Sequence, residues 1–352
     1  MKMEIWRYDL ALTHRWTIAS NFKADGTGGK DVYKTVFVEL TAPDGTKAVG
    51  ESAPSSRYAE SADTVEAFLR KVDPNRLSFD DIPGSLAYLD SIEAANHSAK
   101  GAIDIALLDG AAQRAGLPLY DYFKLGFREG AHHTSFTIGI DSPEKIRQKV
   151  LEAEQYPMLK VKVGSPLDRV NMEALRSAAP TKTVRVDGNE GWKTPDEALR
   201  NIEWLAKDPN IEFIEQPMPS STPPKDWQWL KARSPLPIMA DESCISIADI
   251  PMLADCFNAV NVKLCKTGGP STAFALLSAA RKAGLKTMIG CMIESSVLIS
   301  AAAHLAELTN HLDIDGNLLI TNDPFQGSTG AKGLVSFGAA PTPTGLRVAR
   351  RK

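Results

Sequence analysis

The stretch from residue 159 to residue 263 decides the fold, because it repeats one pattern: LKVKV at 159–163, VRVDGN at 184–189, FIEQP at 213–217, IMADES at 238–243 and NVK at 261–263. Each run is rich in the aliphatic residues of a buried strand and stops at an ionisable side chain. The steps from Asp187 to Glu215, Asp241 and Lys263 are 28, 26 and 22 residues. Each step has the length of one strand–helix unit, so the pattern predicts consecutive parallel strands joined by helices.

Similar patterns extend this series in both directions. Strands are predicted at Thr134–Ile140, Leu159–Val163, Thr183–Val186, Ile211–Ile214, Leu236–Met239, Ala259–Val262, Lys286–Ile289 and Leu318–Ile320. About eight strand–helix units over about 200 residues fit a closed β/α barrel better than an open sheet. We therefore expect an α/β fold with a TIM-like barrel over residues 126–325.

The first third of the chain has a different rhythm. Residues 3–12 and 32–40 alternate like strands, and residues 61–114 are helical in pattern, with a broad apolar stripe at 102–108. This mixture predicts an α+β domain over residues 1–125. The tail, residues 326–352, is rich in Pro and Gly and is expected to pack back on that first domain.

The charged residues at the strand ends are the strongest functional signal. The carboxyl ends of parallel barrel strands share one rim, where barrel enzymes hold their active sites. Three carboxylates on neighbouring strands, Asp187, Glu215 and Asp241, would repel one another by about 4 kcal/mol per pair at an effective dielectric near 20. They would either take up protons or bind a cation. Hard oxygen ligands without a nearby His or Cys favour Mg²⁺.

Two lysines flank this predicted metal site on opposite sides. Lys162 lies with Lys160 on one face of the strand before Asp187, and Lys263 ends the strand after Asp241. Burial and cationic neighbours would lower the pKa of a lysine enough for it to act as a base. One amine would remove the proton next to a metal-bound carboxylate, giving an enediolate, and the other would return a proton to the opposite face. Lys160 and Lys266 are expected to support the site.

Several motifs together resemble the muconate-lactonising subgroup of the enolase superfamily. They are KVK at 160–162, VDGN at 186–189, IEQP at 214–217, ADES at 240–243, VKLCKTGG at 262–269, GESAP at 50–54 and AIDIALLDGAAQRAGLPLYDYF at 102–123. The resemblance covers nearly the whole chain. It implies an α+β capping domain on a modified (β/α)7β barrel, one Mg²⁺ per subunit on the three acids, and Lys162 and Lys263 as the acid/base pair. Gly188 stands where the family often has Ala, a departure that touches none of these roles.

Two further acids, Asp313 and Asp315, narrow the choice among the activities of this subgroup. His311-Leu312-Asp313-Ile314-Asp315 is similar to the DxD segment of dipeptide epimerases, in which the acids bind the free ammonium of the substrate. Two acids spaced by one residue on an extended segment project the same way and could hold one cation jointly. The resemblance thus implies epimerisation at the α-carbon of the C-terminal residue of a dipeptide. A solvated polar loop is the alternative for these acids.

The preferred dipeptide is left open. L-Ala-D/L-Glu is the common substrate of this group, and a Glu side chain would need a cation such as Lys23, in the Gly-rich loop Asn21–Lys30. That loop is either a surface hairpin or a lid, and Lys23 could equally be solvated. Further candidate pocket residues, which could also be packing residues, are Thr134, Ser135, Ile293, Ser295 and Ser296. Hydrophobic dipeptides remain an alternative.

Composition sets outer limits on function. The 352 residues carry a net charge of −3, which argues against a nucleic-acid or membrane-surface binder. The start, MKMEIWRYDL, lacks the apolar stretch of a signal peptide, so we expect a cytoplasmic protein. Cys244, Cys256, Cys265 and Cys291 have no metal or disulfide spacing and are expected to be buried thiols.

Three classes of function are compatible with these features. The leading hypothesis is a Mg²⁺-dependent dipeptide epimerase acting by two-base proton transfer. The second is another enzyme of the subgroup: an N-acylamino acid racemase, an o-succinylbenzoate synthase or a cycloisomerase. The third is a non-catalytic barrel, which would normally have lost an acid or a lysine. A homo-oligomer is possible under each of them.

Overall fold

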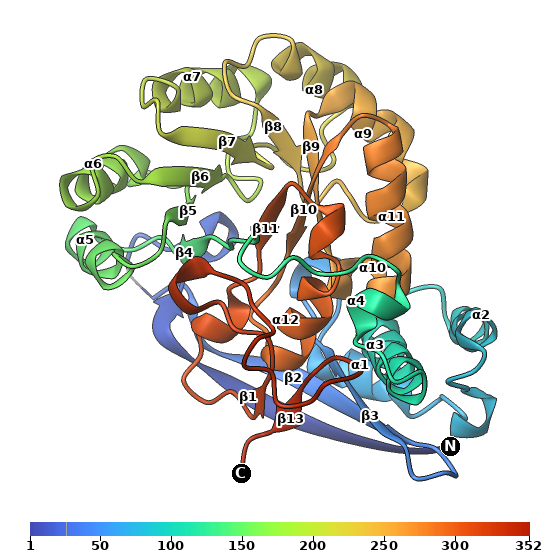
Figure 1. Ribbon diagram of the computed structural model, residues 1–352. Coiled ribbons are helices and arrows are strands. Elements are labelled where there is room, and N and C mark those ends of the chain that lie inside the picture. Colours follow the sequence, from blue (N-terminus) through green and yellow to red (C-terminus); the bar gives the residue numbers. More distant parts are fainter. Residues whose placement is uncertain (26) are drawn as a thin grey trace.

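A computed structural model describes residues 1–25 and 27–352; Gly26, in the predicted loop Asn21–Lys30, lies outside the described residues. The chain forms an N-terminal cap built on an antiparallel sheet and a parallel β/α barrel above it in Figure 1. Within the described residues, we find no helix that combines the length and the apolar character needed to cross a membrane.

The cap is a three-stranded sheet covered by helices. Strand β1 (Lys2–Trp16) pairs antiparallel with β2 (Lys30–Thr41), which pairs with β3 (Lys47–Ser52). The helices are α1 (Ala62–Leu69), α2 (Ile82–Ile92), α3 (His97–Arg114) and α4 (Leu119–Tyr122). Ser61 and Asp81 start α1 and α2 by accepting hydrogen bonds from Thr64 N and Gly84 N, so the predicted helical region is divided at these caps.

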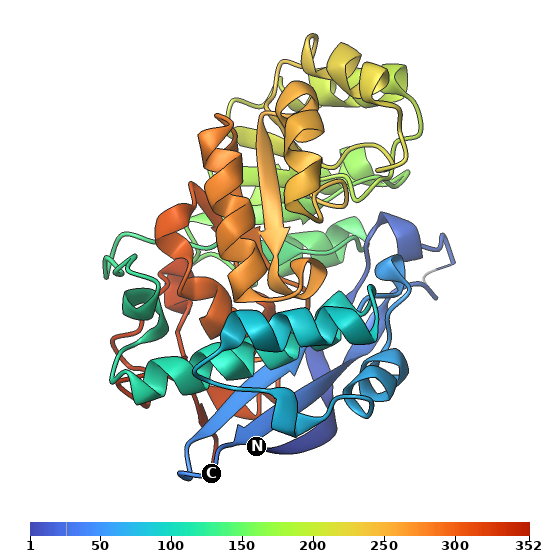
Figure 2. The ribbon, with the colours of Figure 1, turned by 90° about the vertical axis from the view of Figure 1, so that its right-hand side faces the viewer.

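Helix α3 is the connection between cap and barrel. It packs against β3 on one side and against α10 (Leu264–Thr267) of the barrel on the other (Figure 2). Being covered on both sides explains its broad apolar stripe. A Cβ on Gly50 of β3 would lie 1.8 Å from the carbonyl oxygen of Ala102, so only glycine permits this close approach.

The barrel has eight parallel strands and seven helical connections, as the sequence predicts. The strands are β4 (Phe136–Ile138), β5 (Met158–Lys162), β6 (Thr183–Asp187), β7 (Ile211–Glu215), β8 (Ile238–Ala240), β9 (Ala259–Lys263), β10 (Lys286–Gly290) and β11 (His311–Asp313). The connecting helices are α5 (Pro143–Glu152), α6 (Asp168–Ala178), α7 (Pro195–Leu205), α8 (Pro224–Lys231), α9 (Ile250–Cys256), α10 with α11 (Pro270–Lys282), and α12 (Ser296–Ala303). A parallel bridge between Thr134 and Leu312 joins the first and last strands.

The eighth strand differs from the prediction. Residues 318–320 were expected to form it because they are apolar, but β11 is formed by residues 311–313, and Leu318 ends a 3-10 helix. The sequence pattern misleads here because β11 ends at a buried acid, Asp313, whose charge is balanced by Lys160 of β5. Leu319 and Ile320 instead pack against Leu10 of β1.

The tail packs against the cap, and two short strands within it pair with each other. Leu346 N donates a hydrogen bond to Asp109 of α3, and Leu119 N donates one to the carbonyl of Gly345. Strand β12 (Phe325–Gln326) pairs with β13 (Ala349–Arg350). These contacts place both chain ends beside the cap sheet, away from the strand ends that carry the site (Figure 1).

Candidate active site

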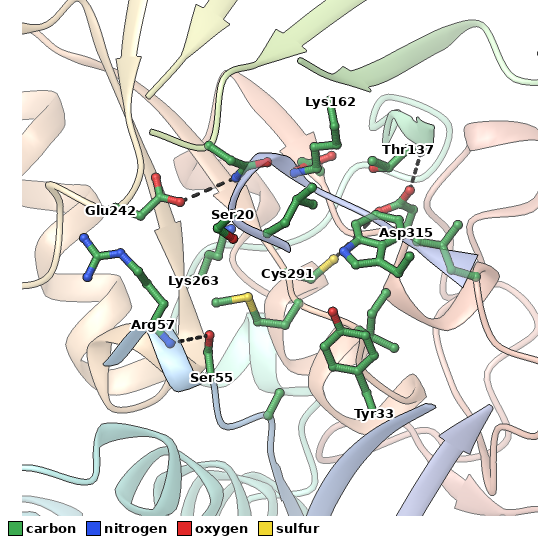
Figure 3. A pocket seen from close by; sticks show the side chains of 18 of the residues that line it. Ser20, Tyr33, Ser55, Arg57, Thr137, Lys162, Glu242, Lys263, Cys291 and Asp315 are labelled. Carbon is green, nitrogen blue, oxygen red and sulfur yellow. Dashed lines mark hydrogen bonds between the residues drawn. The ribbon is translucent and has the colours of Figure 1, made fainter. Parts of the chain in front are cut away.

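A cavity of about 150 Å³ lies where the carboxyl ends of the barrel strands face the cap. Three lysines, Lys160, Lys162 and Lys263, enter it from the barrel, and Asp313 and Asp315 line one part of it. The cap contributes mainly ring and loop residues: Trp16, Ile18, Ser20, Tyr33, Lys34, Ala53, Pro54, Ser55, Arg57 and Tyr58. The cavity is therefore shared between the two parts of the chain (Figure 3).

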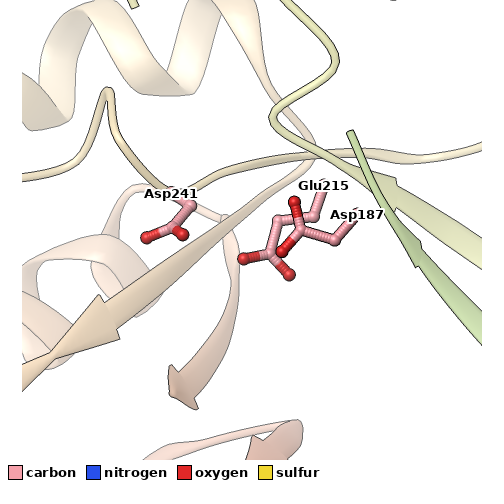
Figure 4. A group of neighbouring side chains, drawn as sticks. All are labelled: Asp187, Glu215 and Asp241. Atoms are coloured by element: carbon pink, nitrogen blue, oxygen red, sulfur yellow. The ribbon is translucent and has the colours of Figure 1, made fainter. Parts of the chain in front are cut away.

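Three buried carboxylates converge beneath this cavity. Asp187 ends β6, Glu215 ends β7 and Asp241 follows β8; each offers an oxygen within 4.8 Å of the others (Figure 4). The parallel register pairs Asp187 with Glu215, which places the acids side by side. Burial, followed by the charge of Asp187, raises the pKa of Glu215 to about 7. Burial also opposes ionisation of Asp187, but Lys162 and Lys160 outweigh it and lower its pKa.

The donor set fits a hard divalent cation. All three ligands are carboxylates, which Mg²⁺ prefers. Glu215 Oε2 is buried and accepts no hydrogen bond within the described residues, although it lies 2.8 Å from the ammonium of Lys160. A carboxylate oxygen that accepts no hydrogen bond keeps its lone pairs open to a metal ion. Asp187, Glu215 and Asp241 could therefore hold Mg²⁺ together.

The two predicted acid/base lysines flank the carboxylates. Lys162 ends β5 and donates to Asp187 Oδ2 at 2.7 Å, while Lys263 ends β9 and donates to Asp241 Oδ2 at 2.8 Å. Because β5 and β9 lie on either side of β6–β8 in the sheet, the two amines approach the cavity from different directions (Figure 3).

The electrostatics of Lys263 differ from expectation. Burial lowers its pKa, but the nearby carboxylates, Asp241 foremost and then Glu215 and Glu242, together outweigh burial and raise the pKa well above its ordinary value. A lowered pKa was expected from burial and cationic neighbours, because the local sequence does not reveal an ion pair this close. A role of Lys263 as base would therefore need a metal ion to share the charge of Asp241, in addition to Lys266 at 2.7 Å from Asp241 Oδ1.

Lys160 forms ion pairs both with the converging carboxylates and with the first acid of the DxD segment. Its ammonium lies 2.6 Å from Asp313 Oδ2, 2.8 Å from Glu215 Oε2 and 3.1 Å from Asp187 Oδ2. The hydroxyl of Ser135 donates to the other oxygen, Asp313 Oδ1, at 2.7 Å. Both oxygens of Asp313 thus have partners within the protein, and Lys160 and Ser135 act as its supports.

Asp315 is engaged differently from Asp313. Its Oδ2 accepts a hydrogen bond from the backbone of Thr137 at 2.6 Å, whereas its Oδ1 accepts a weak hydrogen bond from the thiol of Cys291, with Sγ at 3.8 Å. Burial and then the charge of Asp313 raise the pKa of Asp315 to about 6. Asp315 Oδ1 is consequently the DxD oxygen best placed to accept a cation from the cavity.

The remaining predicted pocket residues divide between the cavity and its supports. Ile293 lines the cavity. Thr134, Ser135, Ser295 and Ser296 do not line it: Thr134 accepts from Ile314 N, Ser295 donates to Glu51 and Ser296 to Asp323. Lys23 is exposed and also lies outside the cavity lining.

Several cavity residues have no signal in the sequence. Arg57, in a 3-10 helix of the cap (Ser56–Tyr58), forms two hydrogen bonds of 2.6 and 2.8 Å with Glu190 on the barrel loop after Asp187. Trp16 and Tyr33 reach the cavity from β1 and β2. Trp16 and Tyr33 are distant in sequence from the motifs, and Arg57 follows GESAP at 50–54 without belonging to it, so only the packing of cap on barrel reveals these residues.

Comparison with known proteins identifies the family. Residues 13–123 match the mandelate racemase/muconate lactonizing enzyme N-terminal domain, and residues 144–330 match the enolase C-terminal domain-like family. The chain is 58% identical over 99% of both sequences to L-Ala-D/L-amino acid epimerase of Pedosphaera parvula. It is 36% identical to L-Ala-D/L-Glu epimerase of Bacteroides thetaiotaomicron, over 97% of this chain and 86% of that one.

Solved structures of similar fold point to the same family. A dipeptide epimerase from Enterococcus faecalis, complexed with Mg and L-Leu-L-Tyr, superposes with a TM-score of 0.88 at 30% identity over 99% of each chain. A substrate-liganded L-Ala-D/L-Glu epimerase from Bacillus subtilis gives a TM-score of 0.90 at 28% identity, over 99% of this chain and 98% of that one. The chain belongs to the mandelate racemase/muconate lactonizing enzyme family of the enolase superfamily.

Proposed function

We propose that this chain is a Mg²⁺-dependent dipeptide epimerase that inverts the α-carbon of the C-terminal residue. The observation that carries the proposal is the placement of Lys162 and Lys263 on either side of the three carboxylates, with Asp315 Oδ1, which accepts a weak hydrogen bond from the thiol of Cys291, on the lining of the same cavity. The relatives support it, since they are named as dipeptide or L-Ala-D/L-amino acid epimerases.

Asp187, Glu215 and Asp241 would hold one Mg²⁺ per subunit. When bound, it supplies positive charge beside the substrate carboxylate and stabilises the negative charge that develops when the neighbouring proton leaves. Its position on Asp187 and Asp241 also matters for the lysines. The ion pair with Asp241 favours the protonated amine of Lys263, and a metal ion held by Asp241 would weaken that pair and so help Lys263 to act as base.

The two lysines carry out the proton transfers. The neutral amine of one lysine accepts the α-proton from one face of the substrate, and the ammonium of the other donates a proton to the opposite face. The reverse reaction exchanges their roles, so both epimers are interconverted by one site. Lys266, whose ammonium lies 2.7 Å from Asp241 Oδ1, holds that carboxylate in place beside Lys263.

Asp315 would recognise the N-terminal ammonium of the dipeptide. A charge-assisted hydrogen bond to a buried carboxylate is strong, and an uncharged acylamide could not replace it. This favours a free dipeptide over an N-acylamino acid, which is the second candidate because N-acetyl-D-glutamate racemase of a Pseudoalteromonas species is 34% identical over 81% of this chain. Lys23 remains the residue predicted to bind a Glu side chain at the C-terminal position of the dipeptide. The cytoplasmic location and the absence of nucleic-acid or membrane partners also remain predictions.

Solvent deuterium incorporation tests the proposal directly. The Mg²⁺-loaded protein is incubated in D₂O with a library of L,L-dipeptides and, in parallel, with N-succinyl and N-acetyl amino acids. We expect one deuterium at the α-carbon of the C-terminal residue, together with formation of the L,D-epimer. Turnover of acylamino acids without exchange into any dipeptide would instead establish the second candidate.

A further inference from the structure

A second cavity adjoins the site cavity and has no role in the chemistry described above. It has a volume of about 90 Å³, and three residues, Trp16, Thr137 and Leu319, line both cavities. These side chains therefore form a partition between the site cavity and the second cavity. We call the second one the outer cavity.

The partition lies directly beside Asp315. Thr137 donates its backbone N–H to Asp315 Oδ2, and Figure 3 shows the two residues adjacent to each other. Leu319 follows Asp315 by one turn of 3-10 helix and packs with Ile293 in the same apolar cluster. If Asp315 holds the N-terminal ammonium of a dipeptide, the α-carbon of the first residue of that dipeptide lies against the partition. The first side chain of a dipeptide must then point toward the partition or back into the site cavity.

The outer cavity is suited to an apolar side chain. Its lining includes Leu12, Phe136 and Leu318. The ionisable residues on its lining already have partners: His14 lies 2.7 Å from Glu152, Arg15 lies 2.5 Å from Asp31 and Lys149 lies 2.9 Å from Asp141. Since these charges are engaged with one another, apolar burial is the interaction that the outer cavity can offer.

We propose that Leu319 and Trp16 set the size limit of the N-terminal residue of the substrate, and that removal of the Leu319 side chain opens the site to the outer cavity and admits a large apolar residue there. This proposal rests on the proposed function, because it assumes a dipeptide whose ammonium meets Asp315. It assigns to the partition the selection of small over large N-terminal side chains.

Leu319 is the better of the two residues to test. The ring of Trp16 lies 5.9 Å from the ammonium of Lys162, so a change at Trp16 would also alter the surroundings of a proposed catalytic amine. Leu319 contributes a hydrocarbon side chain to the partition. Its backbone carbonyl accepts a hydrogen bond from Thr13 N, which an Ala or Val at this position would retain.

The experiment compares Leu319→Ala with Leu12→Ala in the Mg²⁺-loaded full-length protein. Leu12 lines the outer cavity but not the site cavity, so its variant makes the same chemical change without opening the partition. Each protein is assayed by deuterium incorporation with L-Ala-L-Xaa and L-Leu-L-Xaa, where Xaa is the residue that the unmodified protein turns over fastest. The measured quantity is the ratio of kcat/KM for the Leu substrate to that for the Ala substrate.

We expect Leu319→Ala to raise this ratio about tenfold or more, and Leu12→Ala to leave it within about twofold of the unmodified protein. An unchanged ratio in an active Leu319→Ala protein, or an equal rise in both variants, would overturn the proposal. If Leu319→Ala does not fold, Leu319→Val carries the test with a smaller rise expected. Failure of the proposed function gives a different result: the unmodified protein would turn over neither dipeptide.

Discussion

The barrel wall and the cap wall of the site cavity are built on different principles. On the barrel wall, the side chains of Lys160, Lys162 and Lys263 are 1%, 7% and 7% exposed, and each is paired with a buried acid. On the cap wall, Trp16 and Tyr33 present rings, and the side chain of Arg57 is 44% exposed. Charges fixed on strand ends suit proton transfer, which requires accurate placement. A wall of rings and loop residues presents mainly shape and apolar surface to a substrate, so it suits the selection of side chains.

The largest effect is expected from the barrel lysines. Lys162→Ala and Lys263→Ala should each lower epimerisation at least about 10³-fold, because inversion needs both amines. Each variant should retain deuterium exchange into one epimer only, and the two variants should differ in which epimer exchanges. Exchange is measured by mass spectrometry, with Lys282→Ala, an exposed lysine of α11, as control. Unchanged turnover in either variant would remove that lysine from the mechanism.

The two DxD acids should respond differently to the same change. Asp315→Asn should raise KM for dipeptides by about 30-fold or more, since a charged partner for the ammonium is lost, with a smaller effect on stability. Asp313→Asn weakens a buried ion pair with Lys160 and should lower the free energy of unfolding by about 3 kcal/mol. Chemical denaturation and steady-state kinetics on both variants separate these effects. Identical changes in KM and stability for the two would contradict the assignment of the ammonium to Asp315.

Metal binding should stabilise the barrel wall. Mg²⁺ at about a hundred times its Kd should raise the free energy of unfolding of the chelator-treated protein by about 2.7 kcal/mol. Glu215→Gln should lose most of this gain, whereas Glu203→Gln, on the exposed side of α7, should keep it. Denaturation with and without Mg²⁺ provides the measurement. Equal stabilisation of both variants would place the metal elsewhere.

Glu51 links the two walls and should make stability pH-dependent. This buried cap residue accepts hydrogen bonds from Ser295 and Leu298 at the start of α12, which follows the cavity-lining loop of the barrel. Burial raises its pKa to about 7. The folded state therefore binds the proton more tightly than the unfolded state, and stability falls as pH rises from about 4.5 through 7, by about 3 kcal/mol at most.

Glu51→Gln should flatten this part of the pH profile. Denaturation of the variant and the unmodified protein at pH 5 and pH 8 checks the prediction, because other buried acids contribute equally to both. A slope that stays the same in the variant would show that Glu51 does not titrate as its burial implies.

The smallest effect is expected from the exposed part of the cap. Lys23→Ala should lower kcat/KM about two- to fivefold for dipeptides ending in Glu and leave those ending in Leu unchanged, because an exposed charge contributes little binding energy. Lys207→Ala, an exposed lysine after α7, serves as the control. An equal loss of kcat/KM for both kinds of dipeptide would show that Lys23 does not bind the Glu side chain.

The strand-end motifs predicted the barrel wall well, because a parallel barrel brings all carboxyl ends of its strands to one rim. The prediction was wrong at the eighth strand, where apolarity favoured residues 318–320 over residues 311–313. A buried acid inside a strand looks like a loop residue until its cation is known, and Lys160 lies 153 positions away from Asp313. Ser135, Ser295 and Ser296 were predicted as pocket residues but support neighbouring acids, a distinction that spacing cannot make.

The sequence by itself determined the order of the strands, the acids and lysines at their ends, and hence the class of chemistry, since these follow from local patterns and from one rule of barrel geometry. Only the tertiary structure decided which DxD oxygen has the weakest donor, which residues of the cap reach the cavity, and that Leu319 lines two cavities. These features depend on contacts between residues far apart in the chain. Such contacts are fixed by the packing of cap on barrel, and no local pattern encodes them.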